Sequence, residues 1–151
     1  MSLEQQVADG IKKAMLAREE ATLRTLRDIK SAILLAKTSE GFTGEISPAD
    51  EMKMLQKMVK QRKDSLEIYE KKGRADLAAR EKEEIAVIEG FLPKQMTEGE
   101  IREAVKAAIA ETGASSMADM GRVMGVINKE LAGKADGKTI ATLVKEALNS
   151  I

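Results

Sequence analysis

The sequence predicts an all-α protein. Ala, Glu, Lys, Leu and Met are abundant and only two prolines occur, a composition that favours helix over most of the chain. Apolar residues recur at three- and four-residue spacing in the long segments, and no strand-like alternation of useful length is present. At 151 residues the chain is long enough for one ordinary domain or for two small ones.

The first segment, residues 3–37, predicts helix with two possible breaks. One is Gly10 and the other is the polar step over residues 18–20. Beyond that step a single apolar stripe follows the helical period and is formed by Leu23, Leu26, Ile29 and Ile33. The glycine-containing segment 38–48 then predicts the first clear loop, which ends in the start signal of the next helix.

Two further helices are expected before residue 93. The first covers about 48–72, with Ser47 as N-cap, Pro48 at the first helical position and Gly73 as a left-handed stop. The second covers about 75–91. Together with residues 3–37, these segments predict an N-terminal domain of about four helices.

Pro93 marks the best domain boundary in the sequence, because proline disfavours helix at the residue before it. We therefore expect an N-terminal helical domain over 1–93 and a small C-terminal domain over 94–151. Three shorter helices are predicted in the second, over about 98–111, 117–131 and 136 to the end. Their starts carry side-chain caps, including the capping-box pairs Thr97 with Glu100 and Ser116 with Asp119.

The composition argues against an autonomous enzyme. The chain has no cysteine and no histidine, which excludes disulfides, thiolate nucleophiles and imidazole-based catalysis. The carboxylates form no recognisable catalytic or metal-binding motif, so we expect no cofactor and no metal. The net charge is zero and there are three aromatic residues, which is unusual for a protein that stacks on single-stranded RNA.

The chain start, MSLEQQVADGIKK, lacks the apolar core of a signal peptide. No apolar run approaches the length that spans a bilayer. These two features lead us to expect a cytoplasmic protein with no membrane partner.

The densest basic run is MKMLQKMVKQRK at 52–63. Lys53, Lys57 and Lys60 share one helical face and form a secondary basic patch. The favoured interpretation is a solvated face answered by i,i+4 carboxylates, and phosphate binding is the alternative. Arg62 falls within the opposite, apolar stripe, so we expect a structural ion pair with a neighbouring helix or a snorkelling stem. An anion-binding arginine in a groove between helices is the alternative.

The segment 120–140, MGRVMGVINKELAGKADGKTI, holds the other candidate surface. Gly121 and Gly125 predict close packing by a neighbouring helix, with a bare backbone face against RNA as the alternative. The turn AGKADGK places Lys134 and Lys138 around a helix N-terminus, whose free N–H groups attract anions. From the turn alone a solvated surface is the favoured interpretation, and anion binding is the alternative.

The sequence resembles the YqeY family over essentially its whole length. The similarity is carried by LRTLRDIKSAI near the start, by QRKDSLEIYEKKGRADLAAREKEEIAVIEGFLPKQMTEGEI at 61–101 and by DMGRVMGVINKELAGKADGK at 119–138. These small proteins are similar to the C-terminal tail of the B subunit of the glutamyl/aspartyl-tRNA amidotransferase. The resemblance implies a longer helical domain followed by a three-helix domain.

In the larger enzyme the related tail helps to recognise tRNA by its shape and backbone. The resemblance therefore implies a non-catalytic accessory module that binds tRNA or another structured RNA. A label of carbon–nitrogen ligase with glutamine as amido donor belongs to the larger enzyme, whose catalytic parts this chain lacks. The candidate RNA contacts carried over to the C-terminal hairpin are Arg122, Lys129, Lys134, Lys138 and Lys145.

A helical protein-interaction module without an RNA role is the alternative function. Its contact surfaces would be the methionine-rich faces over 52–58 and 117–124, because methionine is an adaptable contact residue. The two functions differ in their expected response to salt, since backbone-led RNA binding weakens steeply as salt rises.

Overall fold

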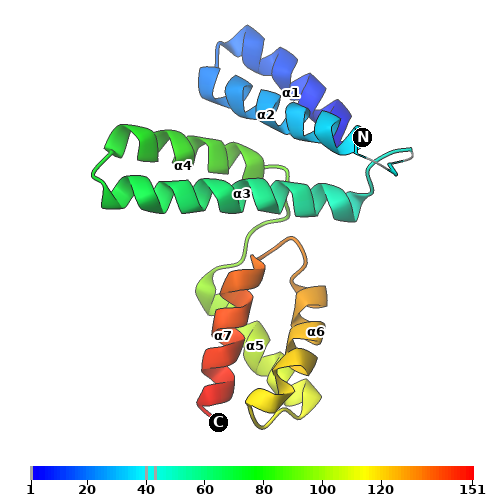
Figure 1. Ribbon diagram of the computed structural model, residues 1–151, viewed down its shortest axis with the longest axis vertical. Helices are drawn as coiled ribbons and strands as arrows, with labels where there is room; N and C mark the ends of the chain where they lie inside the picture. The colour runs from blue at the N-terminus through cyan, green and yellow to red at the C-terminus, as the bar shows by residue number, and fades with distance from the viewer. Residues whose placement is uncertain (1, 40, 43) are drawn as a thin grey trace. The chain divides into compact units, whose positions relative to one another are not determined.

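The computed structural model describes residues 2–39, 41–42 and 44–151 (Figure 1). Its described elements in chain order are α1 (Leu3–Ala17), α2 (Glu20–Lys37), α3 (Pro48–Lys71), α4 (Ala75–Glu89), α5 (Glu98–Thr112), the 3₁₀ turn η1 (Met117–Asp119), α6 (Met120–Glu130) and α7 (Gly137–Asn149). The described residues contain no strand, and the predicted all-α class is confirmed. None of these helices combines the length and the apolar character that crossing a bilayer requires.

The chain forms two compact units, Met1–Pro93 and Lys94–Ile151, which we call the N-unit and the C-unit. In the N-unit α1 packs against α2, α3 packs against α4, and α2 contacts α4, so that two antiparallel hairpins form two layers (Figure 1). The apolar core between them is made of Leu3, Val7, Ala14, Leu26, Ile29, Ile33, Leu55, Met58, Val59 and Ile88.

The break between the first two helices lies at Arg18, which adopts left-handed backbone angles with φ of 57°. Gly10 is not a break but lies inside α1. A Cβ added at Gly10 would come within 3.0 Å of Leu26 Cδ1, so the glycine lets α2 approach closely. The N-cap at Ser47 is confirmed, because its side chain accepts the Asp50 N–H at 3.2 Å.

The C-unit is a bundle of three helices in which α5, α6 and α7 all contact one another. Its core is apolar throughout and consists of Ile101, Val105, Ala108, Val123, Ile127, Leu131, Ala135, Ile140, Leu143, Val144 and Leu148. Both capping boxes are confirmed. The predicted helix over 117–131 begins instead as a 3₁₀ turn, and α6 starts at Met120.

Candidate nucleic-acid interface

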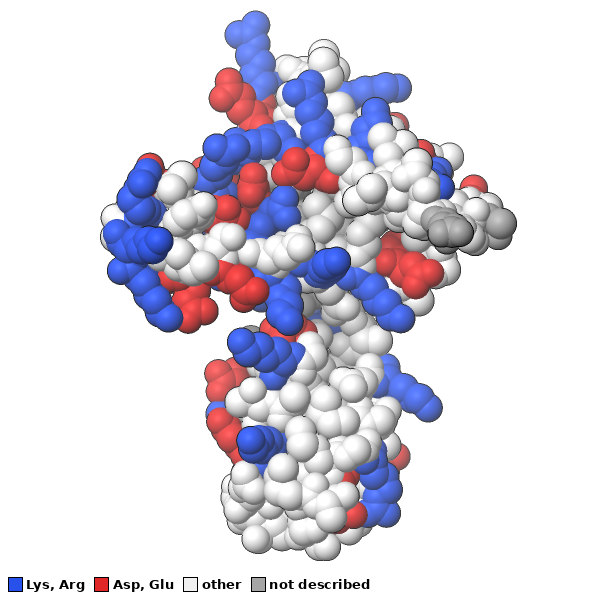
Figure 2. Space-filling view, viewed as in Figure 1, with Lys and Arg blue, Asp and Glu red and all other residues white. Residues whose placement is uncertain are grey.

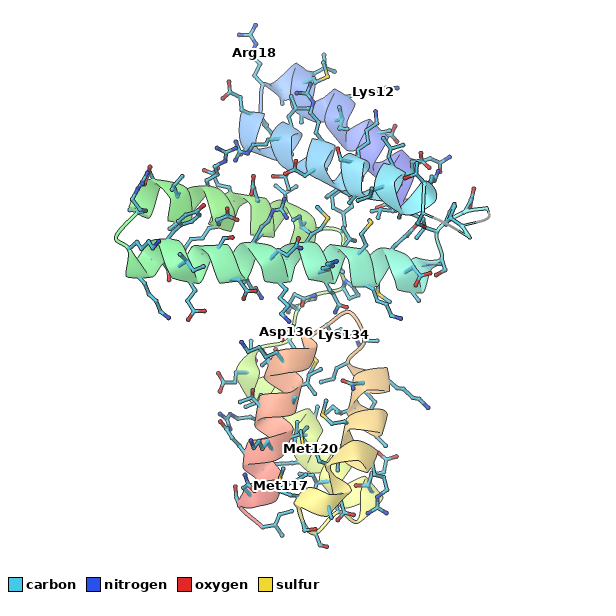
Figure 3. The ribbon with its side chains drawn as sticks, viewed as in Figure 1. Lys12, Arg18, Met117, Met120, Lys134 and Asp136 are labelled. Atoms are coloured by element: carbon cyan, nitrogen blue, oxygen red, sulfur yellow. The ribbon has the colours of Figure 1, made fainter. Side chains whose placement is uncertain are left out.

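The five cationic residues expected to contact RNA all have exposed side chains in the C-unit. Arg122 and Lys129 lie on α6, seven residues apart and therefore on one face, about 10 Å from each other along the helix axis. Lys138 and Lys145 have the same spacing on α7. Lys134 lies in the loop between these helices (Figure 3).

Arg122 is the member of this set whose charge is partly neutralised. Its guanidinium donates to Asp119 Oδ1 at 2.8 Å, across one turn. Within the described residues Lys129, Lys134, Lys138 and Lys145 form no ion pair, although this unit has other surface pairs such as Arg102 with Glu98 at 2.7 Å. Four mobile ammonium groups are thus available to an anionic ligand.

The exposed face of α6 is unusually bare. Gly121 and Gly125 are exposed, and no atom lies within 4 Å of a Cβ built on either one. The expectation that they admit a neighbouring helix is therefore wrong. The helix buries the opposite face instead, through Val123 and Ile127, which have no exposed surface.

The bare part of this face is limited to the two glycines, because Asn128, one turn further along the helix on the same side, is exposed. Arg122 and Lys129 lie beside the glycines on α6. Glycine inside a helix costs about 1 kcal/mol relative to alanine. Since no packing within the C-unit offsets that cost, the face is one on which an external surface can approach the α6 backbone.

The loop that carries Lys134 is held in place by the segment preceding α5. The Gln95 side-chain amide donates to the Gly133 carbonyl at 2.8 Å, and the Met96 N–H donates to the Lys134 carbonyl at 2.9 Å. Gly133 itself has φ of 76°, which favours glycine. The backbone beneath Lys134 is therefore fixed while its ammonium group remains exposed.

The predicted anion site at the start of α7 is not open. Asp136 caps this helix, since its Oδ1 accepts the Thr139 N–H and its Oδ2 accepts the Thr139 hydroxyl, both at 2.8 Å. A carboxylate already occupies the position where a phosphate would meet the helix N-terminus, and it repels a second anion. Lys134 and Lys138 consequently have to act through their own side chains.

The basic run at 52–63 contains cations of two kinds. Lys53, Lys57 and Lys60 are exposed and have no ion-pair partner among the described residues, so the expected i,i+4 pair between Lys60 and Asp64 is not formed. Lys63 instead pairs with Glu89 of α4 at 3.8 Å. Arg62 turns inward.

Arg62 holds α2, α3 and α4 together, which confirms its predicted structural role. Its Nε donates to Glu84 Oε2 at 3.2 Å and its Nη2 to Asp28 Oδ2 at 3.0 Å. Arg24 of α2 donates to the other Glu84 oxygen at 2.9 Å. The side chains of Arg62 and Glu84 are only 14% and 8% exposed, so this is a buried ionic network and not a ligand-binding arginine.

Methionine side chains mostly belong to the cores and not to an open contact face. Met58 is buried, Met54 packs against the N-unit core, and Met120 and Met124 pack against the C-unit core. Met117, in the turn before α6, is exposed, with 37% of its surface accessible (Figure 3). The methionines of 52–58 and 117–124 are thus mostly half-buried, and a protein partner at these faces stays a prediction.

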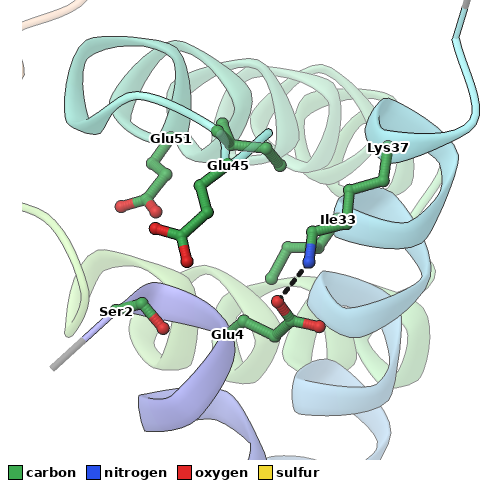
Figure 4. Close-up of a pocket in the computed structure, with 7 residues that line it drawn as sticks. Ser2, Glu4, Ile33, Lys37, Glu45 and Glu51 are labelled. Carbon is green, nitrogen blue, oxygen red and sulfur yellow. Dashed lines mark hydrogen bonds and ion pairs between the residues drawn. The ribbon is translucent and has the colours of Figure 1, made fainter. Parts of the chain in front are cut away.

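Two hollows in the described part of the chain are a small cavity and an open groove. A cavity of about 30 Å³ in the N-unit lies among Ser2, Glu4, Ile33, Lys37, Glu45 and Glu51, where Lys37 pairs with Glu4 (Figure 4). A cavity of this volume can hold only one or two water molecules. An open groove of about 410 Å³ between α5 and α7 has Val105 and Leu143 at its base. No group of acidic residues suited to a metal ion occurs in the described part of the chain.

Comparison with known proteins gives one family match, which covers residues 4–148 and is described as YqeY, Yqey-like protein. Similar curated proteins include "Altered inheritance of mitochondria protein 41, mitochondrial" of Pyrenophora tritici-repentis, 29% identical over 93% of this chain and 77% of that protein. The protein of the same name in Clavispora lusitaniae is 34% identical over 81% of this chain and 72% of its own length.

The same name belongs to a relative in Lachancea thermotolerans, 35% identical over 54% of this chain and 43% of that protein. All three relatives are named as mitochondrial proteins. The expectation of a cytoplasmic location, which relied on the absence of a signal peptide, is contradicted by this finding.

Proposed function

This chain belongs to the YqeY family, and we propose that it is an accessory module that binds structured RNA, with tRNA as the first candidate, through the α6–α7 face of its C-unit. It contributes a shaped cationic surface and no chemistry of its own. The absence of histidine and cysteine from the chain supports this non-catalytic role.

The observation that carries the proposal is the pair of bare glycines on α6 beside Lys129, which pairs with no described residue, and beside Arg122, whose charge Asp119 only partly neutralises. The two glycines would let a bulky, regular surface come close to the helix, with Arg122 and Lys129 beside them to reach phosphates. Further exposed lysines lie on the adjoining loop and on α7.

The ligand chemistry follows from the side chains that the surface lacks. Recognition of unpaired bases normally uses aromatic stacking, and the whole chain has only Phe42, Tyr69 and Phe91. Folded RNA is instead recognised through its backbone and shape. Lysine ammonium groups on flexible stems suit phosphates of varied geometry.

The test measures tRNA binding by fluorescence anisotropy over a range of salt concentrations. It compares the wild-type protein with the double variant Lys134→Glu/Lys138→Glu. We expect the variant to bind at least about tenfold more weakly at moderate salt and to reduce the log–log salt slope by about two units, about one for each lost phosphate contact. Equal affinity and equal slope for both proteins would refute the proposed surface.

A further inference from the structure

The N-unit carries a second cationic surface that the proposed function does not use. We call Lys53, Lys57 and Lys60 the α3 stripe. The three residues are spaced by four and then three positions, which aligns them on one face of α3 over about 10 Å of helix. Asp50 and Asp64 lie at the two ends of this stretch, so the positive region is short and well bounded.

The structure distinguishes the stripe from the other cations of the same helix. Lys63 and Lys71 pair with carboxylates, at 3.8 and 3.0 Å, and Arg62 is inserted into the buried network with Glu84. The stripe residues pair with none of the described residues. Of the five cations in 52–63, two therefore form ion pairs between helices and three pair with no described residue.

We propose that the α3 stripe is a second contact for the same ligand, an inference that rests on the proposed function. The class of ligand is paired, helical RNA. The stripe offers three ammonium groups in a row, which fits a run of phosphates along one strand. No aromatic side chain lies within residues 50–64, so the surface has no platform on which an unpaired base could stack.

A contact on each unit increases affinity more than either contact alone. Once one unit is bound, the other meets the ligand at the high effective concentration set by the chain that joins them. The stripe is therefore expected to change the salt dependence of binding by the whole chain, even though three lysines alone bind weakly.

The test uses the full-length chain in three forms: wild type, a stripe variant and a matched control. The stripe variant is Lys53→Gln/Lys57→Gln/Lys60→Gln. The control is Lys12→Gln/Lys13→Gln/Lys30→Gln, which removes the same number of exposed, unpaired N-unit lysines from α1 and α2. Thermal unfolding checks that all three proteins are equally folded.

The probes are labelled tRNA, a short blunt-ended RNA duplex, one strand of that duplex, and vesicles of phosphatidylcholine with phosphatidylglycerol. We expect the stripe variant to bind tRNA and the duplex at least about tenfold more weakly, with a salt slope lower by about three units, about one for each lost phosphate contact. The control variant should match wild type, and the single strand should bind wild type more weakly than the duplex does.

Each other outcome contradicts the inference in a recognisable way. If wild type binds none of the RNAs, the proposed function fails and the inference fails with it. If wild type binds RNA but the stripe variant behaves like the control, the inference alone is wrong. If the stripe variant loses binding to the anionic vesicles and keeps its affinity for the duplex, the stripe is a membrane contact instead. A stripe-dependent preference for the single strand would overturn the assigned ligand class.

Discussion

The two units of this protein use charge in opposite ways. The N-unit buries charge: Arg24, Arg62 and Glu84 tie three helices together beneath the surface. The C-unit has an entirely apolar core, and its charged groups lie at helix caps and on the surface. Figure 2 shows the surface charge: acidic and basic side chains are intermixed over the N-unit, while much of the visible C-unit surface is uncharged and its charged side chains of both signs lie mostly near the margins.

The difference determines how a substitution has to be interpreted. Arg62 is part of the fold of the N-unit, so loss of binding after its replacement would say little about ligand contact, unlike replacement of the exposed α3 stripe. The candidate cations of the C-unit are outside the core. Replacing them changes the surface charge and leaves the packing intact, so their effects on RNA affinity can be interpreted directly.

The largest effect is expected where the buried charge of the N-unit is broken. Glu84→Ala leaves the guanidinium groups of Arg24 and Arg62 without their shared carboxylate. We expect the free energy of unfolding of the N-unit to fall by about 3–5 kcal/mol, because an unpaired charge would remain in a partly dry site. Urea denaturation, with amide hydrogen exchange to separate the two units, measures the change.

The matched control is Glu83→Ala, one residue away. The Glu83 side chain is 58% exposed and lies 3.7 Å from Arg24, an exposed pair of the kind that contributes less than about 1 kcal/mol. Similar effects of the two substitutions would mean that the buried network does not stabilise the N-unit more than an ordinary surface pair does.

The next largest change in the free energy of unfolding is expected at helical glycines, which differ between the two units. Gly10→Leu forces a side chain toward Leu26, so we expect a loss of about 1–2 kcal/mol from overpacking. Gly121→Gln/Gly125→Gln meets open space and improves helix propensity, so we expect a gain of about 1–2 kcal/mol. Thermal unfolding measures both.

The same α6 variant also tests the proposed function, because the two new side chains cover the bare face. We expect tRNA affinity to fall at least about tenfold while Tm rises. A variant that is more stable and binds tRNA as wild type does would show that the glycine face is not a contact surface.

Much of this architecture could be predicted from local sequence signals. Thr97 with Glu100 and Ser116 with Asp119 mark helix starts through hydrogen bonds between near neighbours, so sequence alone reveals them. The inward turn of Arg62 was predictable from its place in an apolar stripe. Its partner Glu84 was not, because that pairing depends on how α4 is placed beside α3.

The incorrect prediction for Gly121 and Gly125 has a different origin. A helical wheel already places both glycines on the side of α6 opposite Val123 and Ile127, so their exposure was implied by the sequence. The Gly-x-x-x-Gly spacing was given more weight than the wheel. Likewise Asp136 occupies an N-cap position three residues before Thr139, a signal that α7 already has an anionic cap.

A smaller effect is expected at Glu81, which borders the buried network. Burial raises the pKa of Glu81 above its ordinary value of 4.5, and the nearby Glu84 carboxylate raises it further. Its Oε2 is buried without a hydrogen-bond partner. The ionised form is therefore unfavourable in the folded N-unit.

The sign follows from proton linkage. Because the folded protein holds the Glu81 proton more tightly than the unfolded chain does, the penalty is present at neutral pH and is relieved as pH falls toward 4.5. Glu81→Gln should raise the free energy of unfolding at pH 7 by less than about 1 kcal/mol after solvent screening. The difference from wild type should vanish in acid; a gain that is independent of pH would contradict this explanation.

The smallest effect is expected at Asp119, where the C-unit shows a limited version of the charge pairing found in the N-unit. The Ser115 N–H donates to this carboxylate at 2.9 Å and lowers the pKa of Asp119, and the guanidinium of Arg122 also contacts it. The carboxylate therefore stabilises the start of the 3₁₀ turn η1, which leads into α6, above its ordinary titration range, and this contribution is lost as pH falls through its lowered pKa.

Asp119→Asn keeps an oxygen acceptor for the Ser115 N–H and removes the charge that neutralises Arg122. We expect a small fall in Tm and a gain of about two- to fivefold in tRNA affinity, the effect of freeing one exposed cation from a surface pair. Adding Arg122→Gln to Asp119→Asn should abolish the gain. If the gain persists in the double variant, Asp119 opposes RNA by direct repulsion and Arg122 is not one of the contacts.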